Sequence, residues 1–124
     1  MRRQADWYRQ AERKLESARW AIEGGFYEDA CFSAQQAAEL AVKALLESQG
    51  RIELGHSVYL LLRAAGDVRP EVLDAARVLD RYYIPTRYPN GFPAGAPMDF
   101  YDRPVAEEAV AYAEAILGFV RAQL

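Results

Sequence analysis

The sequence predicts an all-α protein: an antiparallel up-and-down bundle of four main helices and one short helix, in a single domain over residues 1–124. Three observations lead to this prediction. Apolar residues recur at steps of three and four, which keeps one face of each helix apolar. Glycines and prolines separate these periodic stretches. No stretch has the pattern of a strand.

The first two helices are expected over residues 6–23 and 27–48. Asp6 is the expected N-cap of the first helix, and the glycines at 24 and 25 end it. Because the connection is so short, the two helices must be antiparallel. The second helix is rich in alanine and apolar on more than one side, so we expect it to be central in the bundle and shared with a second subunit. The expected inward residues are Tyr8, Ala11, Leu15, Ala18, Ile22, Tyr27, Cys31, Ala34, Ala38, Ala41 and Leu45.

A linker over residues 51–56 leads to a short helix that Ser57 caps and that ends before Gly66. Pro70 suits the first turn of the next helix, which is expected to run until Pro85 stops it. Its inward residues are predicted to be Val72, Leu73, Ala76, Leu79 and Tyr83.

Residues 88–101 contain repeated prolines and glycines and are predicted to form an irregular loop. Asp102 and Pro104 then start the last helix. Its inward residues are predicted to be Val105, Ala109, Ala113, Ile116 and Val120.

Composition excludes several kinds of chemistry. A net charge of −3 argues against a protein that coats nucleic acid regardless of sequence. Cys31 and His56 are the only cysteine and histidine, so we expect no disulfide, no zinc cage and no histidine-rich metal site. The usual nucleotide-binding glycine motifs are missing, and no cofactor is predicted. With no apolar run long enough for a membrane span and no signal-peptide pattern, we expect a cytoplasmic protein without membrane contact.

Residues 77–91 are the most informative stretch, because arginines and tyrosines gather where a helical pattern meets two prolines. Arginine offers a planar fork to phosphate, and tyrosine offers a stacking face to a base. The candidate ligand-binding residues are Arg77, Arg81, Arg87, Tyr82 and Tyr88. The alternatives are that Arg77 and Arg81 pair with nearby aspartates at the surface, and that Arg87 holds loop carbonyls.

A second set of residues could line a cleft that faces this segment, namely Gln36, Glu39, Lys43 and His56. Glu39 and Lys43 are four residues apart and could instead form an ordinary surface ion pair. His56 could instead be a hydrogen-bonding residue at the start of the short helix.

The order of these elements resembles that of the HEPN domain family. The resemblance rests on four stretches, at Tyr27 to Leu46 with its Gln-Gln-Ala-Ala-Glu-x-x-x-Lys run, Gly55 to Ser57, Tyr82 to Pro89, and Asp102 to Val120. It implies a helical bundle that usually forms a homodimer and is often encoded beside a minimal nucleotidyltransferase, as in toxin–antitoxin modules. It also implies that many members cut RNA with an Arg-x4–6-His motif.

The chain departs from that nuclease motif. Counted from Arg81, the resemblance places Thr86 in the histidine position and Tyr88 in the position of a following tyrosine. Threonine cannot carry a proton near neutral pH. We therefore expect a homodimeric, non-catalytic nucleotide- or RNA-binding protein that acts with a nucleotidyltransferase. The alternatives are a metal-independent ribonuclease that uses Arg81 and His56, and a purely structural partner subunit.

Overall fold

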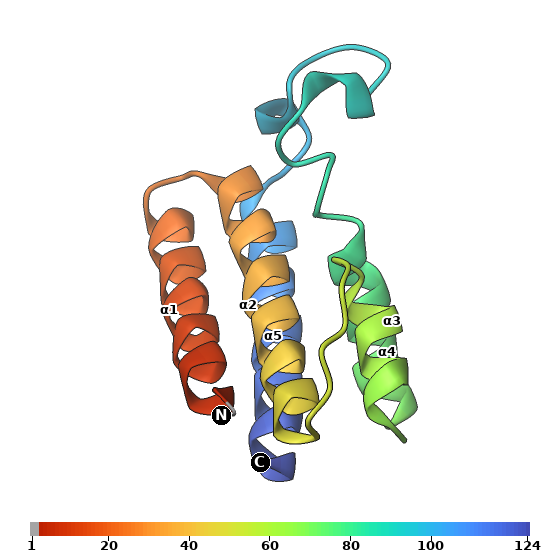
Figure 1. Ribbon diagram of the computed structural model, residues 1–124. Helices are drawn as coiled ribbons and strands as arrows, with labels where there is room; N and C mark the ends of the chain where they lie inside the picture. Colours follow the sequence, from red (N-terminus) through yellow and green to blue (C-terminus); the bar gives the residue numbers. More distant parts are fainter. Residues whose placement is uncertain (1–2) are drawn as a thin grey trace.

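The computed structural model describes residues 3–124, and in this range it contains helices and no strand (Figure 1). The predicted all-α fold is confirmed. The helices are α1 (Gln4–Glu23), α2 (Tyr27–Ser48), α3 (Val58–Ala65), α4 (Pro70–Asp80) and α5 (Arg103–Gln123), with short 3-10 turns η1 (Pro89–Gly91) and η2 (Pro97–Asp99) between α4 and α5.

Helix α2 is the centre of the bundle. It packs against α1, α3, α4 and α5, and α5 in turn packs against α1 and α4. Its small side chains allow this close approach on several sides. The alanines at 30, 34, 37, 38, 41 and 44 are all fully buried. The central position predicted for the second helix is therefore correct.

The predicted helix ends are largely confirmed. Ser57 caps α3, since its hydroxyl accepts a hydrogen bond from the Leu60 backbone N–H, and Asp102 caps α5 in the same way. The prediction for Asp6 is wrong, because α1 begins at Gln4. Asp6 instead lies in the first turn, where a carboxylate suits the positive end of the helix dipole, and pairs with Arg3 at 3.0 Å.

Helix α4 ends four residues earlier than expected, with Arg81 as its C-cap. Pro85 disfavours the whole preceding turn, because its ring would clash with the carbonyl of residue 81 in a continued helix. Side chains then bind the backbone that leaves the helix. The Thr86 hydroxyl donates to the Tyr82 carbonyl at 2.7 Å, and Arg87 Nε donates to the Tyr83 carbonyl at 2.8 Å.

This early ending reverses the predicted directions of two tyrosines. Tyr82, expected to be available to a ligand, packs against the hydrophobic core. Burial raises the pKa of its hydroxyl to about 12. Tyr83, expected to face inward, lies under the His56 ring with centroids 4.5 Å apart. The direction of the chain changes after residue 80. A helical periodicity extended beyond that residue therefore assigns both tyrosine side chains to the wrong side.

Residues 88–101 form an arm that projects beyond the end of the helices (Figure 1). The irregular loop predicted here is confirmed, with the two 3-10 turns inside it. Stacked rings of Phe92 and Phe100, 4.2 Å apart, hold its two sides together. Tyr101 packs edge-on against Tyr82 at 5.9 Å and so fixes the base of the arm.

None of the helices within residues 3–124 combines the length and apolar character needed to cross a membrane.

Candidate functional site

The buried carboxylate of Glu39 is the centre of a polar network. The Lys43 ammonium lies 3.0 Å from it, and His56 Nδ1 lies 3.2 Å from both of its oxygens. The side-chain amides of Gln35 and Gln36 approach it at 3.3 and 3.4 Å. Only 7% of the Glu39 side chain is exposed, so this carboxylate depends on its partners for the hydrogen bonds that water would otherwise make.

Helical spacing and one loop explain how these groups meet. Glu39 and Lys43 are one turn apart on α2, so their side chains lie on one face. The chain after α2 runs back along the helix to His56. There the Gln35 amide donates to the His56 carbonyl at 2.9 Å and fixes the loop against the helix. Of the predicted cleft residues, Gln36, Glu39, Lys43 and His56 are thus brought together.

The His56 side of this network opens onto a surface pocket of about 300 Å³. Residues from the loop before α3 and from the end of α4 form it: His56, Ser57, Asp80, Arg81, Tyr83, Ile84 and Pro85. The His56 side chain is 55% exposed, so the imidazole is held by Glu39 yet open to solvent. Arg81 is exposed, and its guanidinium makes no hydrogen bond or ion pair within residues 3–124.

Arg87 is tied to the protein itself. Its guanidinium carbon lies 4.5 Å from the ring centroids of both Phe32 and Tyr83, and 5.2 Å from that of Tyr88. Together with its hydrogen bond to the Tyr83 carbonyl, these contacts make Arg87 the clamp on loop carbonyls that the sequence left open as an alternative. The stacking also brings Arg87 onto Tyr83, the ring on which His56 stacks.

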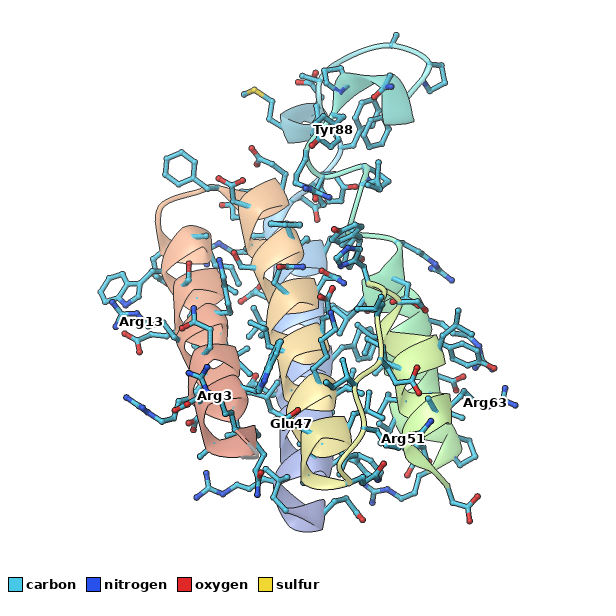
Figure 2. All side chains as sticks on the ribbon, viewed as in Figure 1. Arg3, Arg13, Glu47, Arg51, Arg63 and Tyr88 are labelled. Carbon is cyan, nitrogen blue, oxygen red and sulfur yellow. The ribbon has the colours of Figure 1, made fainter. Side chains whose placement is uncertain are left out.

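The remaining predicted residues lie outside this pocket. Arg77 pairs with Asp74 at 2.6 Å, as the alternative interpretation expected, and donates to the Tyr59 hydroxyl at 3.2 Å. Tyr88 is 47% exposed and lies on the projecting arm (Figure 2). The five predicted ligand residues therefore separate, and only Arg81 lines the pocket beside His56.

Asp80 is a residue whose role the sequence does not reveal. The sequence suggests that Asp80 pairs with an arginine at the surface. Its carboxylate instead accepts hydrogen bonds from the Ser57 hydroxyl at 2.7 Å and the Val58 N–H at 2.6 Å. It thereby joins the end of α4 to the start of α3 and shapes the pocket floor. No spacing rule links positions so far apart, and the capping signal at Ser57 was the only local sign.

The arrangement suits anion binding better than proton transfer by Thr86, the residue at the histidine position of the nuclease motif. The Thr86 hydroxyl is buried and donates to a backbone carbonyl, so it is not available to a ligand. Arg81 offers an unpaired guanidinium, and His56 offers an imidazole whose Nδ1 is held by a carboxylate. Within the described part of the chain, no group of three or more His, Cys, Asp and Glu side chains is arranged to hold a metal ion.

Comparisons with known proteins place this geometry in a family. The model of the HEPN domain matches residues 4–123. Comparison with curated proteins finds no match. Among solved structures, TT1696 from Thermus thermophilus is 46% identical, with a TM-score of 0.98 and 100% of both chains covered.

Two further structures agree. ST0689, described as an archaeal HEPN homologue, is 46% identical with a TM-score of 0.87, over 99% of this chain and 98% of that one. A HEPN domain protein from Thermotoga maritima is 37% identical with a TM-score of 0.76, over 94% of this chain and 95% of its own. With a family model that spans almost every residue and relatives aligned from end to end, this chain belongs to the HEPN domain family.

Proposed function

We propose that this HEPN protein binds a nucleotide or an RNA phosphate in the pocket between His56 and Arg81. The observation that carries the proposal is that an exposed arginine, whose side chain makes no hydrogen bond or ion pair within residues 3–124, lines the same pocket as an anchored histidine. A guanidinium can grip two phosphate oxygens at once, and a protonated imidazole, with Nδ1–H on Glu39, can donate from Nε2 to a third. Tyr83, already stacked under His56, extends the aromatic surface beside them.

Calorimetric titration with adenosine monophosphate and with a short single-stranded RNA tests this proposal. Arg81→Ala should weaken binding by about ten- to a hundredfold, because a hydrogen bond to a charged group contributes about 1.5–3 kcal/mol. Arg77→Ala is the matched control on the same helix, since its guanidinium already binds Asp74 and Tyr59. If the two variants bind equally well, the pocket is not the site.

The assembly that we propose around this pocket is a homodimer that works with a separately encoded nucleotidyltransferase, as in a toxin–antitoxin-like module. Its support is membership of the HEPN family and the family resemblance of the sequence. Light scattering measures the mass in solution, and co-expression with a neighbouring nucleotidyltransferase measures complex formation. A monomer that forms no such complex would contradict this part of the proposal.

A ribonuclease is the second candidate, and one contact favours it. Glu39 holds His56 through Nδ1, which leaves Nε2 free of that carboxylate, and a carboxylate–histidine pair is a common way to orient a general base. Incubation of purified protein with structured RNA in the presence of a chelator tests it. Cleavage that His56→Ala abolishes would favour the enzyme over the binding protein.

A further inference from the structure

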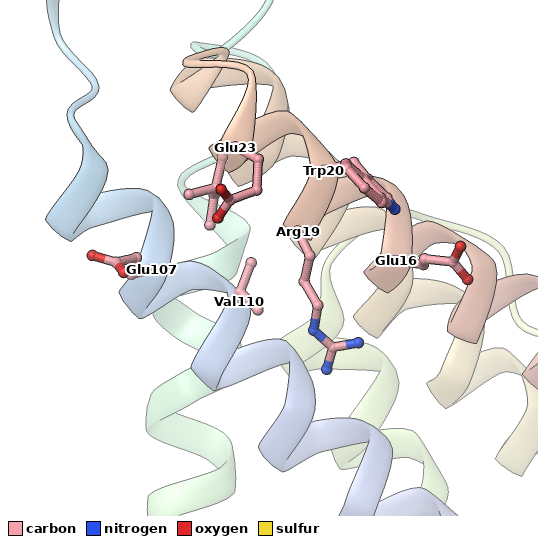
Figure 3. Close-up of a pocket in the computed structure, with 7 residues that line it drawn as sticks. Glu16, Arg19, Trp20, Glu23, Glu107 and Val110 are labelled. Carbon is pink, nitrogen blue, oxygen red and sulfur yellow. The ribbon is translucent and has the colours of Figure 1, made fainter.

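A groove on the opposite side of the molecule, between α1 and α5, has no part in the proposed pocket. It encloses about 530 Å³ and is lined by Glu16, Arg19, Trp20, Ile22, Glu23, Glu107 and Val110 (Figure 3). In Figure 3, Arg19 reaches from α1 toward α5, and Val110 projects from α5 into the gap. Both helices pack against α2, so the groove is the unfilled outer seam of the bundle.

Two side-chain bridges set the length of this groove. Arg19 of α1 pairs with Glu114 of α5 at 2.9 Å, and Arg103 of α5 donates to the Ile22 carbonyl of α1 at 3.4 Å. The stretch of α5 between these bridges is about 16 Å long at 1.5 Å per residue. That length fits two to three turns of another helix, which would present side chains at i, i+3 or i+4, and i+7.

The floor of the groove is apolar and its rim has an exposed tryptophan. Ile22 and Val110 are each only 7% exposed and form the floor, whereas Trp20 is 70% exposed. Tryptophan is among the residues that contribute most to protein–protein binding. Trp20 is therefore suited to cover an apolar side chain that enters the groove.

The lining of the groove carries more negative than positive charge. Glu16, Glu23 and Glu107 line it, and none of them forms an ion pair within the described residues. The one cation in the lining, Arg19, is already paired with Glu114. Three unpaired carboxylates around an apolar floor are complementary to a cationic surface that carries apolar anchors.

We propose that this groove docks a basic amphipathic helix of a partner protein. Two or three apolar side chains of that helix would fill the groove beside Trp20, and its lysines or arginines would pair with the carboxylates of Glu16, Glu23 and Glu107. The rim would steer association, so binding weakens as salt rises.

Tryptophan fluorescence tests the proposal directly, because the chain contains only Trp7 and Trp20. In a Trp7→Phe variant the signal comes from Trp20 alone. The probe is a synthetic helical peptide of about 15 residues with leucines at i, i+4 and i+7 and lysines on both flanks. Binding should shift the Trp20 emission to the blue, whereas the same peptide with glutamates in place of lysines should leave it unchanged.

Substitutions in the groove distinguish docking at this site from non-specific peptide binding. Binding measured by peptide anisotropy should weaken at least tenfold in Trp20→Ala and severalfold in the triple variant Glu16→Gln, Glu23→Gln, Glu107→Gln. Glu71→Gln, an exposed carboxylate on α4, is the matched charge control. Equal binding by all variants, equal binding of the acidic peptide, or no binding of the basic one would overturn the proposal. Loss of a homodimer in Trp20→Ala, seen by sedimentation, would assign the groove to a second copy and would overturn it too.

Discussion

Asp80 and Arg81 are neighbours in the chain, yet their side chains have opposite surroundings. The Asp80 carboxylate accepts hydrogen bonds from Ser57, Val58 and Tyr59, so it is fully used in joining α3 to α4. Arg81 lines the same pocket, and its side chain makes no hydrogen bond or ion pair among residues 3–124. The Asp80 side chain, which holds the fold, thus has its hydrogen bonds satisfied within the chain. The Arg81 side chain, which has unused hydrogen-bonding capacity, faces the pocket.

His56 lies between these two cases. Its ring is fixed on one side by Glu39 and from below by Tyr83, but more than half of the side chain is exposed. Such a group is preorganised, because little conformational entropy remains to be lost when a ligand binds. The comparison therefore separates structural residues, of which Glu39 and Asp80 are examples, from His56 and Arg81, the pair that we propose binds the ligand.

Glu39→Ala should have the largest effect on stability. It removes the buried carboxylate shared by Lys43 and His56 and leaves the largely buried Lys43 ammonium without its partner. We expect a loss of about 2–4 kcal/mol in the free energy of unfolding, measured by urea denaturation. A loss within about 0.5 kcal/mol, the range of ordinary surface substitutions, would show that the network does not hold the fold.

Asp80→Ala should cost about 2 kcal/mol, since the backbone N–H groups of Val58 and Tyr59 at the start of α3 lose their acceptor. Asp80→Asn keeps one acceptor oxygen and should recover part of the loss. The same urea denaturation experiment measures both. Identical stabilities for the alanine and asparagine variants would contradict a capping role.

Tyr82 should make the protein sensitive to alkali. Burial raises the pKa of its hydroxyl to about 12, above the value of 10.0 expected in the unfolded chain. A raised pKa gives stability that is complete below pH 10 and is lost as the pH rises toward 12. Between pH 10 and 12 the Tyr82→Phe variant should therefore lose less free energy of unfolding than the wild type. After allowance for the partial exposure of Tyr82, the difference should be about 1–2 kcal/mol.

The matched control for this titration is Tyr59. Hydrogen bonds from Arg63 and Arg77 lower the pKa of its hydroxyl, so its contribution to stability grows as the pH rises through the range just below 10. Ultraviolet absorbance of the phenolates distinguishes the two residues. Tyr59 should ionise before Tyr82, so Tyr59→Phe should remove absorbance change at lower pH than Tyr82→Phe does. The opposite order would contradict the packing of Tyr82 against the core.

Arg81→Ala should have the smallest effect on the fold. Because the Arg81 side chain has no hydrogen bond or ion pair to lose within residues 3–124, the substitution should change the free energy of unfolding by less than about 0.5 kcal/mol. Thermal and urea unfolding measure this change. A larger loss would mean that Arg81 belongs with Glu39 and Asp80 among the residues that hold the structure.

The sequence predicted the fold and part of the pocket. Local signals determine the helices, and the caps at Ser57 and Asp102 were identified from residue type alone. His56 and Arg81 were both predicted as candidates, but their meeting depends on the path of the loop before α3. That path follows from contacts such as Gln35 to the His56 carbonyl, which periodicity does not encode.

The errors concentrate where the helix ends. The sequence predicts correctly that Pro85 stops the helix, but α4 ends a full turn before the proline. The predicted directions of Tyr82 and Tyr83 are exchanged as a result. The arginines of residues 77–91 were grouped because they are close in sequence. A helix end followed by a turn sends each in its own direction, so Arg77, Arg81 and Arg87 have three different surroundings.

A double-mutant cycle on His56 and Arg81 tests the central claim most directly. Affinity for adenosine monophosphate is measured by calorimetry for the wild type, His56→Ala, Arg81→Ala and the double variant. If both side chains contact one phosphate, the two losses should be non-additive by at least about 0.5 kcal/mol, while the matched cycle with Arg77→Ala should be additive. Additive losses for His56 and Arg81, or unchanged affinity in either single variant, would contradict a shared site in this pocket.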